Sequence, residues 1–169
     1  SNLHSDDVAL RDLLAERTGV SPSDLPFAAE LLQVRQGDQE WTAAAEQALR
    51  GLARSILVPD RIYRTFAREI DGMKLRRRVS YNRINTNIKT APKKLDPRAL
   101  GTKIEIKDGE FHAWLSAEIS SRMDYLCAES LEEFTKYPRA VLRSGQIKHS
   151  ATRHEKNADR QINDRSNLS

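Results

Sequence analysis

Residues 51–63, with the sequence GLARSILVPDRIY, join the end of one helix to a short strand and the strand to a second helix. The run SILV at residues 55–58 is short and apolar, which is typical of a buried strand. Pro59 ends this strand because proline has no backbone N–H to donate, and Asp60 can then cap the next helix by accepting hydrogen bonds from its first turn. A buried strand between two helices predicts layers of α and β structure.

Both helices beside this strand have one apolar face. Residues 39–52 form the clearest helix of the chain, and the helix that follows Asp60 ends at Gly72. Apolar residues recur in each helix at the three- and four-residue spacing of a helix face, so we expect both faces to point into a core. The inward positions are Trp41, Ala44, Ala45, Ala48, Leu49 and Leu52 in the first helix and Ile62, Tyr63, Phe66, Ala67 and Ile70 in the second.

The rest of the chain alternates between strands and helices in the same way. A helix capped by Ser5 is predicted over residues 6–18, and a strand over 27–34, where Ala and Leu would equally allow a helix. Further strands are predicted at residues 78–84, 103–107, 125–128 and 140–143, further helices from 108 or 109 onward and over 130–137, and a polar loop over 85–97. We therefore expect an α/β fold of two lobes, with short mixed sheets covered by helices.

Composition limits the class of protein. The 169 residues fit one domain, and 38% hydrophobic with 31% charged residues indicates a small core with much solvated surface. Cys127, the single cysteine, lies in an apolar context and is predicted to be a core residue, because a nucleophilic thiol needs a neighbouring base that the local sequence lacks. No apolar run approaches the roughly 20 residues of a membrane span and no signal peptide is visible, so we expect a cytoplasmic protein without membrane contact.

The positive charge of the chain is concentrated in residues 73–94, which contain eight basic residues and no acid, against a net charge of +4 for the whole chain. Such a segment can be a solvated surface, but the complete absence of acids, with Tyr81 and several Asn interleaved, favours contact with DNA phosphates. The contact would be independent of sequence, because no recognition helix is evident. The predicted DNA-binding residues are Lys74, Arg76, Arg77, Arg78, Arg83, Lys89, Lys93 and Lys94.

Motifs for catalysis, cofactors and metals are missing from the sequence. None of the seven glycines belongs to a GxxxxGK or GxGxxG motif, and the four histidines and one cysteine lack zinc-ligand spacing. We therefore predict no catalytic residue, no metal site and no cofactor. The run RHEK at residues 153–156 places His154 next to Glu155, which could act as an acid–base pair. Its polar surroundings favour a surface or interface role instead, because they provide no buried pocket.

Three stretches, taken in order, resemble one protein family. They are residues 51–63, SLEEF at 130–134, and AVLRSGQIKHSATRHEKNADRQINDR at 140–165. Together they are similar to the hinge region of an SMC-like ATPase of the Wadjet plasmid-defence system, the JetC family, which is related to MukB. The resemblance runs from about residue 27 to residue 165 and includes RHEK near the exit from the hinge. Residues 157–160 (NADR) depart from the Asp-Asp-Arg that often follows RHEK in the family.

The resemblance implies a domain organisation and a set of partners. Residues 25–149 would form the hinge and dimerisation domain, residues 1–24 the helical stub of one coiled-coil arm, and residues 150–169 a polar tail that leads to the second arm. The ATPase heads lie at the far ends of such a protein, so this part would not be an enzyme. Its partners would be a second copy of the chain, its own arms, DNA and, indirectly, the kleisin-like, KITE-like and nuclease subunits of a Wadjet complex.

A homodimer would form if a strand edge of one copy pairs with another copy. The strand and turn over residues 140–147 are the predicted edge, because Gly145 allows a close approach of two backbones. The residues expected at this interface are Val141, Arg143, Gly145, Gln146 and Ile147.

Two alternative functions stay open from the sequence. A small metal-dependent nuclease would need paired carboxylates at strand ends, and the candidates are the scattered Glu105, Asp108 and Glu110, together with Lys156. A freestanding nucleic-acid-binding module would use the same basic segment but would lack the arms. Long heptad segments on both flanks of the full-length protein would distinguish a hinge from such a module.

Overall fold

Strand β2 (Ile56–Pro59) lies between two hydrophobic cores in the computed structural model, which describes residues 3–88 and 91–158. Ile56 and Val58 point into one core and Leu57 into the other, because successive side chains of a strand lie on opposite faces. All four residues of β2 are buried. The prediction of a buried strand here is confirmed, and the apolar run is continuous because both faces of the strand are covered.

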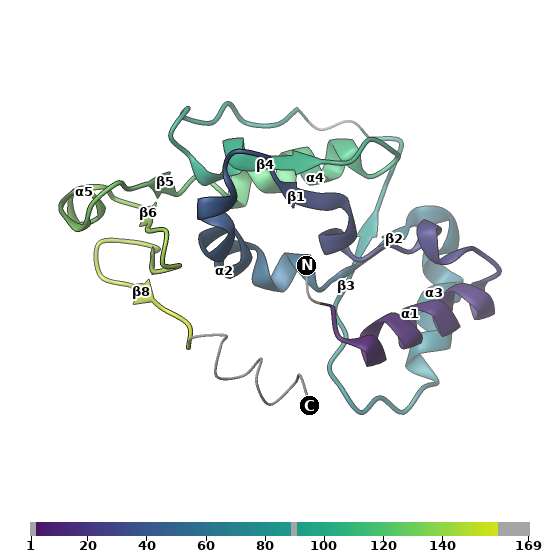
Figure 1. The fold of residues 1–169 in the computed structure, drawn as a ribbon. Coiled ribbons are helices and arrows are strands. Elements are labelled where there is room, and N and C mark those ends of the chain that lie inside the picture. Colours follow the sequence, from purple (N-terminus) through teal and green to yellow (C-terminus); the bar gives the residue numbers. More distant parts are fainter. Residues whose placement is uncertain (1–2, 89–90, 159–169) are drawn as a thin grey trace.

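The first lobe covers one face of β2 with helices α1 (Ser5–Thr18) and α3 (Asp60–Asp71), which lie side by side (Figure 1). Its core contains Leu14, Ala15, Leu25, Phe27, Ile56, Val58 and Phe66. The cap of α1 is His4 rather than the predicted Ser5, because the Asp6 N–H donates to Nδ1 of His4 at 3.0 Å. Gly19 ends the helix in the left-handed region, with φ of 75°.

A buried arginine fastens α1 to the rest of the first lobe. The Arg11 side chain is only 5% exposed and donates to both carboxylate oxygens of Glu30, at 2.6 and 3.1 Å. It also donates to the Leu25 carbonyl at 3.0 Å and lies 5.2 Å from the centre of the Phe27 ring. The helix predicted as an arm stub is therefore packed into this lobe on its inner face.

The second lobe lies on the opposite face of β2. It contains α2 (Thr42–Ala53), α4 (His112–Arg122) and the antiparallel pair β1 (Leu32–Val34) and β4 (Ile104–Ile106). Strand β3 (Tyr81–Ile84) pairs in parallel with β2 and contributes to both cores through Tyr81 and Ile84. Short 3₁₀ helices connect these elements at Pro22–Asp24, Ala28–Leu31, Gln39–Trp41 and Leu100–Lys103.

The expected strand over residues 27–34 is only half correct. Ala28–Leu31 form a 3₁₀ turn, and the strand begins at Leu32. The turn is closed by the Glu30 carboxylate, which accepts a hydrogen bond from the Phe27 N–H at 2.9 Å while it binds Arg11. The hydrogen bond that closes the turn is local, and Arg11, from α1, holds the carboxylate that makes it.

The C-terminal sheet lies at the end of the molecule opposite α1 and α3 (Figure 1). Its strand order is β5 (Leu126–Cys127), β6 (Ala140–Val141), β7 (Ile147–Lys148) and β8 (His154–Glu155). Helix α5 (Leu131–Lys136) connects β5 to the parallel β6. Ser130 caps α5 as predicted, since its Oγ accepts from the Glu133 N–H at 3.2 Å, but Glu133 itself accepts from Glu129 rather than from the cap residue.

Strand β8 is not indicated by the sequence. It lies within residues 150–169, which are expected to form a polar tail, and it pairs antiparallel with β7. Its two residues have polar side chains, so no apolar alternation marks the strand. Among the helices in the described part of the chain, none has the length and apolar composition needed to cross a membrane. The α/β fold with two lobes and short mixed sheets is as predicted.

Candidate nucleic-acid interface

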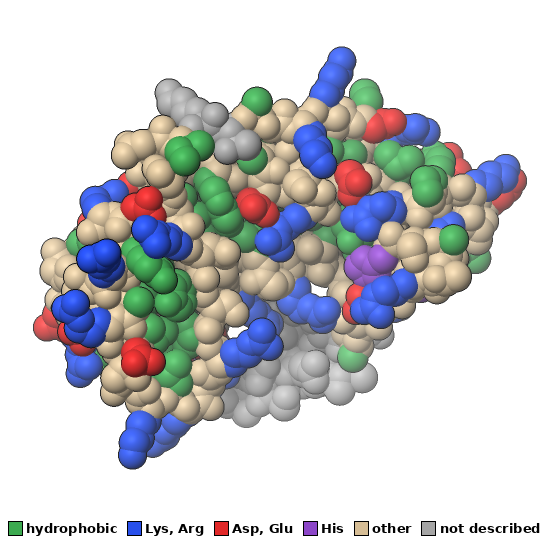
Figure 2. Space-filling view, turned by 180° about the vertical axis from the view of Figure 1, so that it is seen from behind, with side chains coloured by type: hydrophobic (Ala, Val, Ile, Leu, Met, Phe, Trp, Pro, Cys, Tyr) green, Lys and Arg blue, Asp and Glu red, His purple; other side chains and the backbone are tan. Residues whose placement is uncertain are grey.

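The structure distributes the predicted basic residues over three places. Lys74, Arg76, Arg77 and Arg78 lie in the loop between α3 and β3, Arg83 lies on β3, and Lys93 and Lys94 lie in the loop that precedes Leu100–Lys103. Lys89 falls outside the described residues. Figure 2 shows Lys and Arg side chains scattered over both lobes of one face rather than gathered in one patch. The segment that is continuous in sequence is therefore divided between two loops and a strand.

Two of these residues already have acidic partners. Arg77 donates from Nε and Nη2 to the two carboxylate oxygens of Asp7, at 3.1 and 3.3 Å. Arg83 donates to Asp60 at 2.7 Å, and its guanidinium lies 4.2 Å from the centre of the Tyr63 ring. The hydrogen bond from Arg83 to Asp60 raises the pKa of Arg83 above its ordinary value.

A cleft of about 560 Å³ brings four arginines together, and we call it the arginine cleft. It lies between the start of α1, the C-terminal end of α2 and the loop that enters β3. Arg50 and Arg54 come from the end of α2, and Arg77 and Arg78 from the loop. Of the described residues that line the cleft, Asp7 is the one acid. Concave surfaces with this excess of guanidinium groups attract phosphate.

Sequence reasoning missed Arg50 and Arg54. Arg50 lies in the last turn of α2 and Arg54 is the residue that caps its C-terminal end, where the helix dipole favours positive charge. The buried side of α2 carries Ala45, Leu49 and Leu52 into the core of the second lobe. The i,i+4 arginines directly before the buried strand were the available signal, but only the fold places them beside residues 77 and 78.

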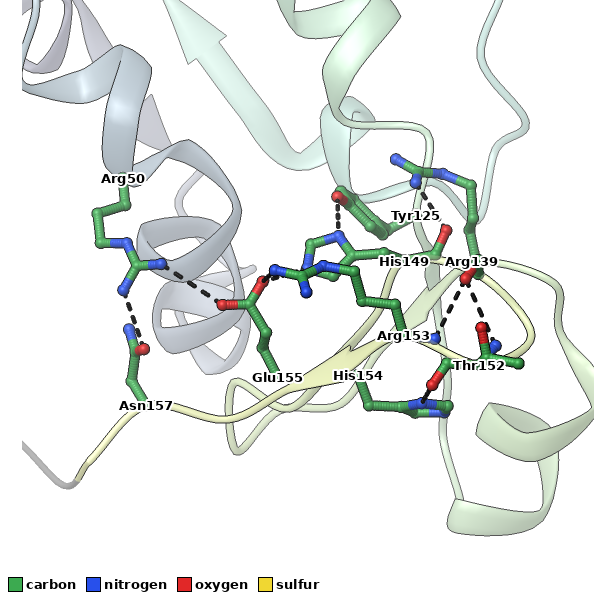
Figure 3. Close-up of polar contacts among 10 residues, drawn as sticks. Arg50, Tyr125, Arg139, His149, Thr152, Arg153, His154, Glu155 and Asn157 are labelled. Atoms are coloured by element: carbon green, nitrogen blue, oxygen red, sulfur yellow. Dashed lines mark hydrogen bonds and ion pairs between the residues drawn. The ribbon is translucent and has the colours of Figure 1, made fainter.

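The arginines of the cleft differ in their partners. Arg50 donates from Nη1 to the Asn157 side-chain oxygen at 3.0 Å, and its Nη2 lies 3.7 Å from Glu155 (Figure 3). Within the described part of the chain, Arg54 and Arg78 make no hydrogen bond or ion pair. The cleft therefore contains two arginines with internal partners and two exposed arginines without a partner among the described residues.

Glu155 is the centre of a polar cluster that fastens β8 (Figure 3). Its carboxylate lies 2.6 Å from Nε2 of His149 and 3.4 Å from Arg153, in addition to Arg50. Nδ1 of His149 lies 2.8 Å from the Tyr125 hydroxyl. The hydrogen bond with His149 holds the pKa of Glu155 below its ordinary value.

His154 and Glu155 of the RHEK run do not contact each other as an acid–base pair, the role that the polar surroundings of this run already disfavoured. His154 lies on the other side of β8 from Glu155, with Nδ1 3.1 Å from the Thr152 carbonyl and its ring 5.9 Å from that of Phe134. The histidine that Glu155 contacts is His149, six residues earlier. The contacts of Glu155 join β7, β8 and α2.

The predicted dimer edge over residues 140–147 is not a free edge in this chain. Strand β6 lies between β5 and β7, and β7 lies between β6 and β8. Val141 and Ile147 are buried in the core of the second lobe. Gly145, with φ of 94°, lies in a turn against the backbone of Ala43, where a side chain would be 3.5 Å from its carbonyl oxygen.

The other two residues of that predicted interface lie in the same turn region. Arg143 stacks 4.6 Å from the centre of the Trp41 ring and pairs with Glu40 and Glu129. Gln146 is half-buried. Their contact with a second copy stays a prediction. Within the described residues, the strands at the outside of their sheets include β3 and β8.

Of the carboxylates of the nuclease alternative, Asp108 and Glu110 line one pocket. Glu110 forms an ion pair with Arg61 at 2.7 Å, whereas Glu105 lies on β4. Among residues 3–88 and 91–158, no three His, Cys, Asp or Glu side chains are placed to hold a metal ion. Cys127 is buried, and burial raises the pKa of its thiol to about 11, so at neutral pH it stays protonated.

Comparison of this chain with known proteins finds solved structures with a similar fold. No protein-family model and no curated protein matches this chain. The Pyrococcus furiosus SMC hinge domain is similar with a TM-score of 0.59 and 20% identity, over 93% of this chain and 91% of that one. A P. furiosus Smc hinge domain with an extended coiled coil is similar with a TM-score of 0.61 and 18% identity over 96% of this chain. This chain spans 63% of the length of that structure.

A third similar structure is the SMC hinge domain of Geobacillus stearothermophilus, crystallised as an asymmetric dimer. Its TM-score is 0.50, with 15% identity over 95% of this chain and 78% of that one. The chain therefore has the fold of an SMC hinge domain, as its sequence predicted.

Proposed function

We propose that this chain is the hinge dimerisation domain of an SMC-like ATPase of the JetC type, and that the whole protein acts on DNA in a cytoplasmic Wadjet plasmid-defence complex. The observation that carries the hinge function is the match to almost the entire length of a solved SMC hinge domain. In this function the domain is not catalytic. It holds two copies of the motor together, and its two ends continue into coiled-coil arms.

The positions of the described ends support attachment of two neighbouring arms. Asp7 near the start of α1 and Asn157 after β8 both reach arginines of the same cleft. The first and last parts of the described chain thus approach one region of the surface. Kleisin-like, KITE-like and nuclease subunits would act with the whole protein, and this domain would meet them only through the arms.

A second copy would bind at strand edges that the described chain leaves open. Strand β3 pairs with β2 on one side, and the Ile56 N–H donates to the Ser80 carbonyl at 3.0 Å. In a parallel pair, alternate residues direct their N–H and C=O groups away from the partner strand. The backbone groups of Tyr81 and Arg83 therefore point away from β2. Pairing of this edge with a strand of another copy would give a stable dimer.

The test of dimerisation is the mass in solution and its response to one edge proline. Light scattering at micromolar concentration should give twice the chain mass of 19.2 kDa. Arg83→Pro removes one outward N–H and should weaken the dimer at least ten-fold, since a ladder hydrogen bond is lost at the interface. Arg83→Ala removes the same ion pair with Asp60 but keeps the N–H, and should leave the dimer intact. A monomer in the unmodified protein would contradict the hinge function.

We also propose that DNA contacts the domain at the arginine cleft and the loop around Arg76. The support is the concentration of guanidinium groups there and the two arginines, Arg54 and Arg78, with no described partner. Binding would follow the phosphate backbone and be independent of sequence. The remaining predicted residues Arg83, Lys93 and Lys94 lie on other elements and would contribute at most at longer range.

Fluorescence anisotropy with a labelled duplex over a series of salt concentrations tests this surface. The slope of log K against log salt is negative, and each lost phosphate contact makes it less steep by roughly 0.9. Arg54→Ala with Arg78→Ala should therefore reduce the slope by up to about 1.8. Arg122→Ala, on α4, removes an arginine paired with Glu118 and is the matched control. An unchanged slope in the double variant would exclude the cleft as the DNA site.

A further inference from the structure

Two arginines have a double role in the arginine cleft. Arg77 lines the cleft and uses the Nε–Nη2 edge of its guanidinium to bind Asp7 of α1. Arg50 lines the cleft and uses Nη1 and Nη2 for Asn157 and Glu155 at the end of the described chain. A phosphate binds an arginine best through two parallel N–H donors of one edge. A phosphate that takes up either of these edges therefore displaces a contact that holds α1 or β8.

We infer that a nucleic-acid phosphate in the arginine cleft competes with Asp7 for Arg77 and with Glu155 and Asn157 for Arg50, so that binding loosens β8. This inference rests on the proposed contact between the cleft and DNA. In the free protein the carboxylates of Asp7 and Glu155 act as internal counterions of the two arginines. Each is an inhibitor of DNA binding, and each is displaced when the phosphate backbone enters.

The two ends respond differently to this competition. Helix α1 keeps its place when Arg77 turns away, because Leu14 and Ala15 are fully buried and Arg11 stays bound to Glu30. Strand β8 has two residues, and its attachment to α2 depends on Arg50. Loss of Arg50 leaves Glu155 with His149 and Arg153, which come from the same C-terminal segment. The structural response to binding is therefore concentrated at β8.

The first experiment measures duplex affinity by fluorescence anisotropy at about 0.1 M salt, where charges farther away than roughly 10 Å are screened. Asp7→Asn frees Arg77 and should tighten binding by about three-fold, the effect expected for one partly exposed ion pair. Asn157→Ala frees Nη1 of Arg50 without any change in charge and should tighten binding by about two-fold. The control is Glu132→Gln on α5, which removes the same charge from an exposed pair with Lys136 and should change affinity much less.

The second experiment measures amide hydrogen exchange with and without duplex. The segment from β7 to β8, which includes the bond from the His149 N–H to the Arg153 carbonyl, should exchange faster in the complex, whereas amides of α4 should not. Slower or unchanged exchange in this segment would overturn the inference, as would equal affinities of Asp7→Asn and Glu132→Gln. If the protein still binds duplex, either of these two results would refute the competition but not the contact between the cleft and DNA. Absence of binding at low salt would overturn the DNA contact and the inference together.

Discussion

Helix α1 and strand β8 stand at the two ends of the described chain, and they are held in different ways. α1 buries Leu14 and Ala15 in the first lobe and directs Arg11, whose side chain is only 5% exposed, into an ion pair. β8 pairs two residues with β7 and is tied to α2 through the ion pair of Glu155 with Arg50, an arginine that is 48% exposed. Exposed ion pairs contribute at most about 1 kcal/mol, whereas buried groups resist separation until the lobe itself unfolds. One end is fixed by the core, and the other can open locally.

The largest expected effect breaks the fixed end. Arg11→Ala leaves the Glu30 carboxylate without its partner and removes the hydrogen bond to the Leu25 carbonyl. Breaking a pair with one buried member should lower the free energy of unfolding by about 2–3 kcal/mol, less than for a fully buried pair because Glu30 is partly exposed. Urea denaturation measures this change. Arg17→Ala, exposed on the same helix, should change stability by less than about 0.5 kcal/mol. If Arg11→Ala and Arg17→Ala had equal effects, Arg11 would not fix α1 to the core and the distinction between the two ends would be refuted.

A smaller and local effect is expected at β8. Glu155→Gln removes the charge that attracts Arg50, Arg153 and His149, so β8 should open more often. The expected cost is about 1 kcal/mol or less, and it should be seen as faster amide exchange between β7 and β8 with no shift of the urea midpoint. A loss of global stability comparable with that of Arg11→Ala would mean that β8 belongs to the core after all.

The smallest effect is the dependence of β8 on pH. The pKa of Glu155 is lowered in the folded protein, chiefly by the hydrogen bond with His149 and further by Arg153 and Arg50. A lowered carboxyl pKa stabilises the folded state at pH values above the unfolded pKa of about 4.3, and this contribution disappears as the pH falls through the folded pKa. Exchange of β8 relative to α4, corrected for intrinsic rates, should therefore increase below about pH 4.3. Glu155→Gln should remove that increase, and an identical pH profile in the variant would contradict the assignment.

The elements that the sequence predicted well are those whose cause is local. The SILV run needed only its apolar composition to be recognised as buried, and the helix after Asp60 needed only its apolar spacing. Ser130 was found as the cap of α5 because its partner, the Glu133 N–H, is three residues away. The failures have distant causes. The Glu30 carboxylate that closes the turn at residues 28–31 is held by Arg11, and β8 depends on pairing with β7 rather than on any pattern of its own.

The candidate site shows the same division. A scan of charge along the chain found Arg77 and Arg78 because they lie in an acid-free segment. It could not find Arg50 and Arg54, which lie at the end of α2 outside the acid-free segment and reach the cleft only because α2 ends beside the loop before β3. It also grouped Lys93 and Lys94 with residues that the fold places on another element. Electrostatic fields act through space, so adjacency in sequence predicts them only within one element.

The sequence by itself determined the alternation of strands and helices, the buried strand at the centre and the resemblance to a hinge, because hydrophobic periodicity and caps act over a few residues. The tertiary structure alone decided that β2 separates two cores, that residues 140–147 form an internal hairpin rather than an edge, and that both ends of the described chain meet at one arginine cleft. Each of these depends on which elements pack together, and packing joins residues that are more than 20 positions apart, such as Arg50 with Asn157 and Asp7 with Arg77.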